Sequence, residues 1–233
     1  MSEISFKKWN NILGWLCFIS AVIIYGLTAE PTVSFWDSGE YILSASKLNV
    51  GHPPGAPLFQ MLGAFFSIFA IEQSQIGFIM NLMSGVASAF TVLFMFWSIS
   101  ILLSKISSSL KSKTDNYLTI LISSFIASLS FIFTDTFWFN AVETEVYAMA
   151  TLIMSLLFYL GLRWEQEMHL PKGNRWLILI SFVVGLSFGV HFMGLLTIPA
   201  IGLIYFFKNY KPITIKKFIL ANVVVVGILM FVF

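Results

Sequence analysis

Residues 76–103 read IGFIMNLMSGVASAFTVLFMFWSISILL and contain no Asp, Glu, Lys or Arg. At a rise of about 1.5 Å per residue, about 20 apolar residues in a helix cross the hydrocarbon core of a membrane. The whole chain of 233 residues shares this character, since 58% of it is hydrophobic and 10% is charged. Apolar runs of this length do not suit the alternating faces of a soluble domain. The sequence therefore predicts an all-α polytopic membrane protein.

The other apolar segments extend this prediction along the chain. The predicted spans are residues 10–28, 76–103, 117–137, 145–162, 176–190, 192–207 and 218–233. We interpret residues 1–233 as a single transmembrane domain, and we expect it to be the N-terminal part of a longer protein because Phe233 falls inside an apolar run. The one cysteine, Cys17, lies within the first span, so no disulfide framework is predicted.

The cations gather in four short clusters between the predicted spans. They are Lys7, Lys8, Lys105, Lys111, Lys113, Arg163, Lys172, Arg175, Lys208, Lys211, Lys216 and Lys217. Cytoplasmic loops of membrane proteins carry an excess of Lys and Arg, so we place these clusters and the N-terminus in the cytoplasm. Only Lys47 lies outside them. Because topology accounts for the cations, the net charge of +2 indicates no nucleic-acid partner.

Residues 29–75 then form a long loop on the opposite, outer face. Its apolar stretch, residues 56–71, is short for a span, and a crossing here would put the cluster at Lys105 on the wrong side of the membrane. We therefore predict short surface helices in this loop, with residues 56–71 forming an amphipathic or half-inserted helix. The alternative is a real crossing that leaves one loop on the wrong side.

Two outer segments carry pairs of carboxylates beside aromatic residues. Asp37 and Glu40 lie in VSFWDSGEYILSA, residues 33–45, and Glu143 and Glu145 lie in NAVETEVYAM, residues 140–149. Acidic residues contribute little to membrane orientation, so topology does not explain them. We expect the two segments to converge on one pocket at the level of the lipid headgroups.

A structural role is the alternative for both segments. Asp37 with Glu40, and Asn140 with Glu143, have the spacing of a capping box at a helix start. Trp36 and Tyr41 are likewise expected at any membrane interface. The occurrence of two such segments favours a site. Because the second segment is predicted to start a helix, we expect only one of its two glutamates to reach the pocket.

Two histidines lie in unusual surroundings. His52, Pro53 and Pro54 belong to GHPPGAPLF, residues 51–59, where the prolines predict a rigid turn that presents the histidine at the surface. The alternative is a turn that only leads into the surface helix. His191, in GVHFMGLL, is either a packed, hydrogen-bonded core residue or a functional residue near the membrane face.

Four motifs, FWDSGEY, GHPPGAPLF, NAVETEVYAM and GVHFMGLL, together resemble the N-terminal membrane region of a bacterial protein family of unknown function. That family is related to the eukaryotic transmembrane protein O-mannosyltransferase. More distantly, the chain is similar to GT-C superfamily glycosyltransferases. The resemblance implies a GT-C-like transmembrane helix bundle in the bacterial inner membrane, with its active site on the periplasmic face. It also implies transfer of a sugar, mannose being the candidate, from a polyprenyl-phosphate donor to a protein or glycan acceptor.

The resemblance implies catalytic roles for Asp37 and for Glu143 or Glu145, and a role for the turn at His52, Pro53 and Pro54. The other candidates follow from the residues themselves, with Glu40 in a supporting role. Asp37 is the expected base, and the other catalytic candidates are Glu40, Glu143 and Glu145. The expected substrate-binding residues are Trp36, Tyr41, Lys47, His52, Pro53, Pro54 and His191. Among these, the two histidines and the lysine could donate hydrogen bonds to the donor phosphate, and the lipid tail would lie between helices.

We expect no cofactor and no metal, although paired carboxylates could hold a divalent ion. Two alternative functions remain. A transporter would place carboxylates near the membrane midplane, with broken helices and repeats. A noncatalytic membrane scaffold would explain the caps and the aromatic residues, and would tolerate Asp37→Asn.

Overall fold

The computed structural model describes residues 2–109 and 116–232, and within these ranges every regular element is a helix. The elements are α1 (Glu3–Thr28), α2 (Ser38–Lys47), α3 (Pro57–Ser67), η1 (Gln73–Gln75), α4 (Ile76–Ser109), α5 (Tyr117–Ile132), α6 (Asp135–Val142), α7 (Val146–Glu167), α8 (Asn174–Ser187), η2 (Phe192–Leu196), α9 (Thr197–Asn209) and α10 (Ile215–Val232). Lys111 and Lys113 of the second cationic cluster, and Phe233 of the last predicted span, lie outside the described residues.

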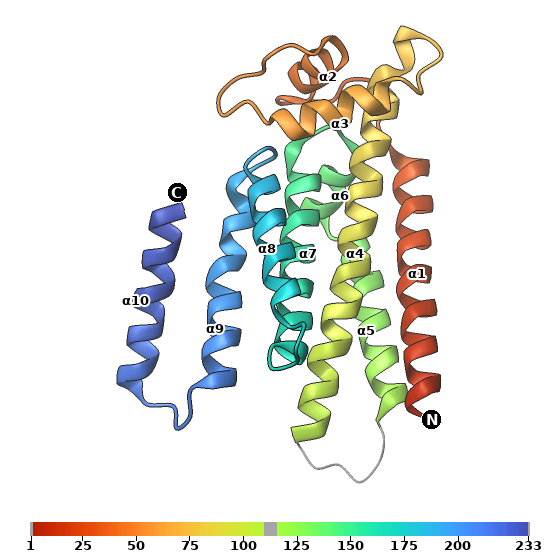
Figure 1. Ribbon diagram of the computed structural model, residues 1–233. Helices are drawn as coiled ribbons and strands as arrows, with labels where there is room; N and C mark the ends of the chain where they lie inside the picture. Colours follow the sequence, from red (N-terminus) through yellow and green to blue (C-terminus); the bar gives the residue numbers. More distant parts are fainter. Residues whose placement is uncertain (1, 110–115, 233) are drawn as a thin grey trace.

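The long helices run side by side as a bundle, in which α4 packs against α1, α5 and α7 (Figure 1). By length and composition, four helical segments of the described chain can cross a membrane: 3–28, 73–109, 146–167 and 192–209. A fifth arises if the bent pair α5 and α6 counts as one span. The chain is therefore an all-α polytopic membrane protein. The 14 residues of α8 extend about 21 Å, less than a hydrocarbon core of about 30 Å.

The segment predicted as one span over residues 117–137 is instead broken. Helix α5 ends at Ile132, and α6 starts at Asp135 with a bend of 64° between the two axes. Thr134 has an extended backbone, and its hydroxyl donates a hydrogen bond to the Phe131 carbonyl at 2.9 Å. Local bonds of this kind compete with helix continuation. As a result, the stretch expected to be an outer loop, residues 134–145, contains the short helix α6.

Two buried apolar clusters hold the bundle together. One joins α1, α4, α5 and α6 around Cys17, Tyr25 and Phe96, and the Tyr25 hydroxyl donates to the Ile132 carbonyl at 2.9 Å. The other joins α3, α7 and α8 around Phe59 and Leu157. The second cluster includes a surface element, α3, so the outer loop is packed onto the bundle rather than free of it.

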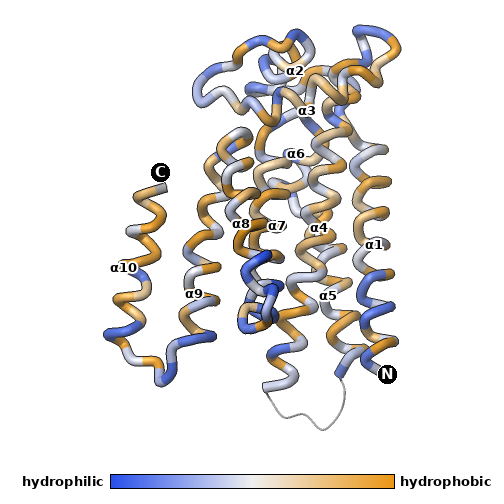
Figure 2. Tube along the Cα trace, in the orientation of Figure 1, coloured by the Kyte–Doolittle hydropathy of each residue, from blue (hydrophilic) through white to orange (hydrophobic). Residues whose placement is uncertain are grey.

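Cations from at least three of the four clusters lie at one end of the bundle. Lys105 of α4 and Lys208 of α9 both form ion pairs with Glu165 of α7, the second at 3.0 Å. Figure 2 shows hydrophilic residues at this end, in the turns after α7 and α9 and at the start of α1. The segment carrying α2 and α3 lies at the opposite end (Figure 1). The cations and the outer loop therefore occupy opposite ends of the helices.

Helix α3 lies across the end of the bundle instead of running parallel to α4 (Figure 1). The amides of Leu58 and Phe59 donate to the Gly189 carbonyl at 2.7 and 3.2 Å, which ties the start of α3 to the segment after α8. Both of its faces are apolar, because Phe59 is buried while Met61 and Phe65 are exposed. Residues 56–71 thus do not cross the bundle. Helix α3 is apolar on both faces, which does not fit the amphipathic form of the prediction, and the half-inserted form stays a prediction.

Candidate functional site

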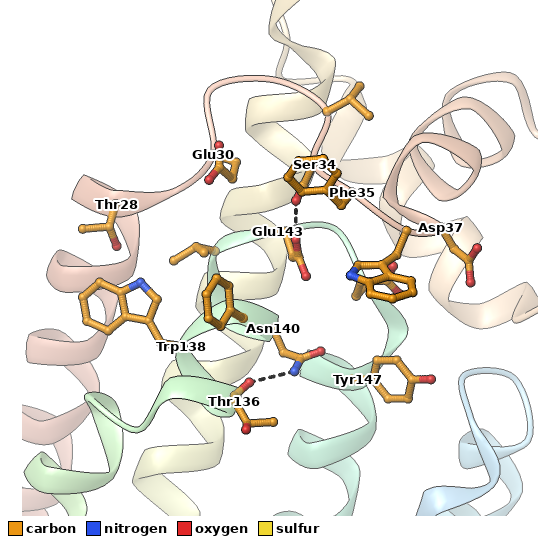
Figure 3. Close-up of a pocket in the computed structure, with 15 residues that line it drawn as sticks. Thr28, Glu30, Ser34, Phe35, Asp37, Thr136, Trp138, Asn140, Glu143 and Tyr147 are labelled. Atoms are coloured by element: carbon orange, nitrogen blue, oxygen red, sulfur yellow. Dashed lines mark hydrogen bonds between the residues drawn. The ribbon is translucent and has the colours of Figure 1, made fainter.

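A cavity of about 950 Å³ opens at the end of the bundle that carries α2 and α3. Its lining comes from residues 28–37, from α6 and from the start of α7, as Figure 3 shows. The lining residues are Thr28, Glu30, Val33, Ser34, Phe35, Trp36, Asp37, Thr136, Trp138, Phe139, Asn140, Val142, Glu143, Glu145 and Tyr147. Two segments about 100 positions apart therefore share one pocket.

Four carboxylates line this cavity. Glu30 and Asp37 come from the segment after α1, and Glu143 and Glu145 come from the segment between α6 and α7. The lining also includes four large aromatic side chains beside Tyr147, which gives one pocket both negative charge and flat apolar surfaces. Such a combination suits a sugar, whose hydroxyls can donate to carboxylates while its ring packs on aromatic faces.

Both Glu143 and Glu145 line the pocket, and the expectation that only one would reach it is wrong. The physical reason is local backbone structure. Helix α7 starts at Val146, so both glutamates have extended backbones with φ values of −129° and −137°. In an extended chain, residues two apart project to the same side, whereas at a helix start they would diverge.

Glu145 is the most buried of the pocket carboxylates, with 5% of its surface exposed. Its Oε1 atom has no hydrogen-bond partner among the described residues. Burial, and then the charges of Asp37 and Glu143, raise the pKa of the Glu145 carboxyl to about 7, while the amides of Asp37 and Val146 act in the opposite direction. A carboxyl with this pKa can hold or release a proton near neutral pH.

The capping box that was the structural alternative at Asp37 and Glu40 does not form. Asp37 occupies the N-cap position of α2, but its side chain makes no capping hydrogen bond. Glu40 instead accepts hydrogen bonds from the backbone amide of His52 at 2.6 Å and from its Nδ1 at 3.1 Å. These bonds, the backbone one first, lower the pKa of Glu40. Glu40 therefore holds the turn at residue 52 against the start of α2.

His52 brings a second ring nitrogen toward Asp37. Its Nε2 lies 4.0 Å from Oδ2 of Asp37, and its ring lies 5.7 Å from that of buried Tyr41. One ligand atom from each of Asp37, Glu40 and His52 lies within 4.8 Å of the others, so these exposed residues could hold a divalent cation. The turn itself closes through a hydrogen bond from the Gly55 amide to the His52 carbonyl at 2.8 Å.

Of four other predicted site residues, one lines the pocket and three do not. Trp36 lines the pocket with 90% of its surface exposed and a left-handed backbone, φ 59°. Pro53 and Pro54 are exposed in the turn after His52 and do not line the pocket. Lys47 is exposed in the last turn of α2 and also lies outside the lining.

His191 lies beside the pocket rather than in its lining. It is half-buried, its Nδ1 accepts a hydrogen bond from the Met193 amide at 3.2 Å, and its ring lies 5.4 Å from the pocket residue Tyr147. Burial lowers the pKa of this histidine. The structure therefore gives His191 a capping hydrogen bond and, through Tyr147, contact with the pocket wall.

Several pocket residues were not predicted as part of a site. Ser34 donates a hydrogen bond to Glu143, and Glu30 adds the fourth carboxylate. Asn140 lies inside α6, where its side chain donates to the Thr136 carbonyl at 2.8 Å (Figure 3), so the alternative of a capping box at Asn140 and Glu143 does not form either. Asn81 does not line the pocket but bonds to both of its segments, and here the sequence held a usable signal, because Asn81 is a polar residue within a long apolar span.

Comparison with known proteins identifies relatives of this chain. The family model of the protein O-mannosyl-transferase TMEM260 N-terminal domain matches residues 37–214. Protein O-mannosyl-transferase tmem260 of Dictyostelium discoideum is 29% identical over 167 residues, which cover 69% of this chain and 18% of that protein. Protein O-mannosyl-transferase TMEM260 of Mus musculus is 26% identical over 170 residues, covering 73% of this chain and 22% of that protein.

The chain thus spans about a fifth of the length of these curated relatives. No solved structure is significantly similar to it. The family match starts at Asp37 and extends beyond α9, so it includes the segments that carry Asp37, Glu143, Glu145 and His191. On this match, which covers most of the sequence, the chain belongs to the family of the protein O-mannosyl-transferase TMEM260 N-terminal domain.

Proposed function

We propose that this chain forms the membrane part of a glycosyltransferase with a GT-C-like helix bundle. It transfers a sugar, mannose being the candidate, from a polyprenyl-phosphate donor to a hydroxyl of a protein or glycan acceptor. The observation that carries the proposal is the pocket that gathers four carboxylates from two distant segments at one end of an apolar bundle. The relatives are protein O-mannosyl-transferases by name, which supports the same reaction class.

In the proposed reaction the acceptor hydroxyl attacks the anomeric carbon of the sugar. A carbon–oxygen bond forms there, the bond from that carbon to the phosphate oxygen breaks, and polyprenyl phosphate leaves with the electron pair. The hydroxyl proton passes to the Asp37 carboxylate, which acts as the general base. Asp37 suits this role because it lines the pocket and is exposed to an incoming acceptor.

The other carboxylates have different tasks in this scheme. Glu143 stabilises the positive charge that develops on the sugar, and Glu145, with a pKa of about 7, donates a hydrogen bond to a sugar hydroxyl when it is neutral. Glu40 acts indirectly by holding His52 beside Asp37. The exposed indole of Trp36 offers a flat face for the sugar ring.

The donor phosphate needs hydrogen-bond donors, which ionised carboxylates do not supply. His52 is the best placed, since its Nε2 lies 4.0 Å from Asp37, and Pro53 and Pro54 shape the turn that presents it. His191 is a second donor beside Tyr147. Lys47 lies outside the pocket lining and would reach the phosphate only from the far end of α2.

We further propose that the site faces the periplasm across a bacterial inner membrane, with the N-terminus in the cytoplasm. The positive-inside rule supports this orientation, because cations of at least three separate clusters share the end of the bundle opposite the pocket. The polyprenyl tail then lies against apolar helix faces in the membrane while its phosphate reaches the pocket mouth.

A transfer assay tests the proposed function. Full-length protein in membranes receives synthetic polyprenyl-phosphate mannose and a hydroxyl-bearing peptide, and turnover is compared for wild type, Asp37→Asn and the matched control Asp135→Asn. Asp135 is an exposed acid at the start of α6 that does not line the pocket. We expect loss of turnover, with donor binding retained, only in Asp37→Asn. Equal turnover in all three proteins would reject Asp37 as the base.

A transporter is the second candidate, and one observation favours it: the break of 64° between α5 and α6 resembles a broken span. The carboxylates, however, gather at one end of the bundle rather than at its midplane. Uptake of labelled sugar phosphate into proteoliposomes, without any transfer product, would support transport over transfer.

A further inference from the structure

The two acid-bearing segments are joined by a buried polar residue of the longest helix. Asn81 of α4 is fully buried, and its Nδ2 donates hydrogen bonds to the carbonyls of Glu30 at 2.8 Å and Thr32 at 2.9 Å. Its Oδ1 accepts a hydrogen bond from the hydroxyl of Thr144 at 2.5 Å. One side chain therefore contacts the segment that leads to Asp37 and the segment that contains Glu145.

The partner residues sit directly beside the carboxylates. Thr144, also fully buried, lies between Glu143 and Glu145 in sequence. The Glu30 amide also donates to the Val142 carbonyl at 2.9 Å, so the two segments are bonded to each other as well as to Asn81. Every hydrogen bond in this set joins segments that the chain separates by dozens of residues, so local folding alone does not bring them together.

Two glycines flank Asn81 at one helical turn on either side, at positions 77 and 85. A Cβ at Gly77 would lie 3.4 Å from the backbone of Thr32, and one at Gly85 would lie 3.4 Å from the carbonyl of Ala141 and 3.2 Å from Tyr25. Residues four apart share a face of a helix. This face of α4 thus brings its backbone close to both segments, with Asn81 between the two contacts.

We propose that Asn81 is a positioning residue that, together with Thr144, holds the segment of Asp37 and the segment of Glu145 at the spacing the pocket requires. We call Asn81, Thr144 and the carbonyls of Glu30 and Thr32 the asparagine clamp. Its role in transfer rests on the proposed function, whereas its role in pocket geometry does not.

Burial explains why the clamp dominates the local geometry. In an apolar surrounding, a carbonyl or amide without a partner costs more free energy than a typical hydrogen bond contributes. Removing the Asn81 side chain leaves the Thr144 hydroxyl and two carbonyls without this partner at once. The two segments then lower their free energy by moving toward water or toward other donors. This movement changes the distance between the carboxylates they carry.

Spin labels can report this distance without any activity. In a Cys17→Ala background, Val33→Cys and Asp135→Cys place one label on each side of the pocket, and double electron–electron resonance measures the distribution of their separation. Both residues are exposed, so the labels do not enter the core. A second labelled pair, Ile19→Cys with Ile178→Cys, lies on exposed faces of α1 and α8 and reports whether the bundle is intact.

The variants are Asn81→Leu, Thr144→Val, Thr144→Ser and Thr91→Val. Thr144→Ser keeps the hydroxyl that Thr144→Val removes. Thr91 is the matched control, because it is a buried hydroxyl on the same helix that bonds only to the Ala87 carbonyl of that helix, at 3.2 Å. We expect Asn81→Leu and Thr144→Val to broaden the 33–135 distribution by about twofold or more, since each leaves buried polar groups unpaired. Thr144→Ser and Thr91→Val should match the parent.

An unchanged 33–135 distribution in Asn81→Leu, with an intact 19–178 pair, would overturn the inference. If Asn81→Leu also disturbs the 19–178 pair, the test rests on Thr144→Val and Thr144→Ser, which differ in keeping the hydroxyl. Equal 33–135 distributions in these two variants would then overturn the positioning role of the clamp.

Activity adds an independent readout. Because Asn81 does not line the pocket, its loss should lower kcat by about tenfold or more through misplaced carboxylates, with little change in donor KM. If wild-type protein transfers no sugar while the label distances change as expected, the proposed function is rejected. The positioning role of the asparagine clamp is then still supported.

Discussion

Ser34 donates a hydrogen bond to the carboxylate of Glu143, a residue 109 positions away in the sequence. This bond joins the segment after α1 to the segment between α6 and α7 on the pocket side (Figure 3). Asn81 joins the same segments from the α4 side. The two pocket segments are therefore joined from two directions, by the half-buried Ser34 and by the fully buried Asn81.

Replacing Ser34 by alanine removes the donor to Glu143. We expect Ser34→Ala to lower the free energy of unfolding by about 1 kcal/mol, the usual net contribution of one hydrogen bond. Ser34→Thr keeps the hydroxyl and should retain most of the stability. Thermal unfolding of the purified protein in detergent measures both variants. Equal losses in Ser34→Ala and Ser34→Thr would show that the contact contributes nothing.

Replacing Glu145 by glutamine should make the protein more stable at alkaline pH. The folded-state pKa of about 7 lies above the ordinary value of 4.5, so the folded protein binds more protons and loses stability as pH rises from about 4.5 to 7. Glutamine does not titrate. The difference in unfolding free energy between Glu145→Gln and wild type should therefore shift in favour of the variant by up to about 3 kcal/mol between pH 4 and pH 8.

Unfolding midpoints measured between pH 4 and pH 9 check this prediction, with Asp135→Asn as the control because that acid is exposed. A difference between Glu145→Gln and wild type that does not grow with pH would mean that Glu145 is not a buried charge in the folded protein.

Replacing Gly63 by alanine should disturb the packing of α2 on α3. A Cβ at Gly63 would lie 2.9 Å from the Cβ of Ala45 and 2.6 Å from Cε of Met80. Because Ala45 is fully buried in α2, the helix that starts beside Asp37 has to move. We expect a loss of about 1–3 kcal/mol in unfolding free energy, as for other overpacked cores, and a lower rate of transfer.

Gly185→Ala is the matched control in α8, because nothing lies within 4 Å of its Cβ position. It should be neutral or stabilise the protein by up to about 1 kcal/mol, since alanine favours helices over glycine. Parallel unfolding curves in detergent compare the two variants. Similar losses in both would mean that the Gly63 contact is not responsible.

Chelation tests whether the transfer reaction uses a metal. With Asp37 as the base, the reaction needs no metal, so we expect EDTA to leave the turnover of the full-length protein unchanged. Loss of turnover that added Mg²⁺ or Mn²⁺ restores would contradict this expectation. In that case Asp37, Glu40 and His52 are the ligands to examine, since their ligand atoms lie within 4.8 Å of one another.

Much of the fold could be predicted because a membrane helix requires a long apolar run, which the sequence shows directly. The uncharged run of residues 76–103 predicts the core of α4, and the helix extends beyond it to Ser109. The break between α5 and α6 could not be predicted, because apolar residues continue across it and only the backbone at Phe133 and Thr134 leaves the helical region. Hydropathy carries no information about such a bend.

The candidate site was also predictable in part, because charged residues are conspicuous in an apolar chain. Asp37, Glu143 and Glu145 stand out as acids beside aromatic residues in the sequence, and all three line the pocket. The prediction that a single glutamate would reach it failed because it depended on a helix boundary, which lies at Val146. The roles of Ser34 and Thr144 depend on partners dozens of positions away and leave no pattern along the chain. For Asn81 the sequence shows only its polarity within an apolar span and not the partners it bonds to.

By itself, the sequence determined that this protein is a bundle of apolar helices with its cations between them, because solvation in lipid acts on each segment according to its own residues. Only the tertiary structure decided which polar groups meet. Hydrogen bonds such as those of Asn81 form between segments that the bundle brings together, and the buried position of Glu145 follows from what packs around it. Those contacts, and the raised pKa they produce, belong to the folded arrangement rather than to any stretch of the chain.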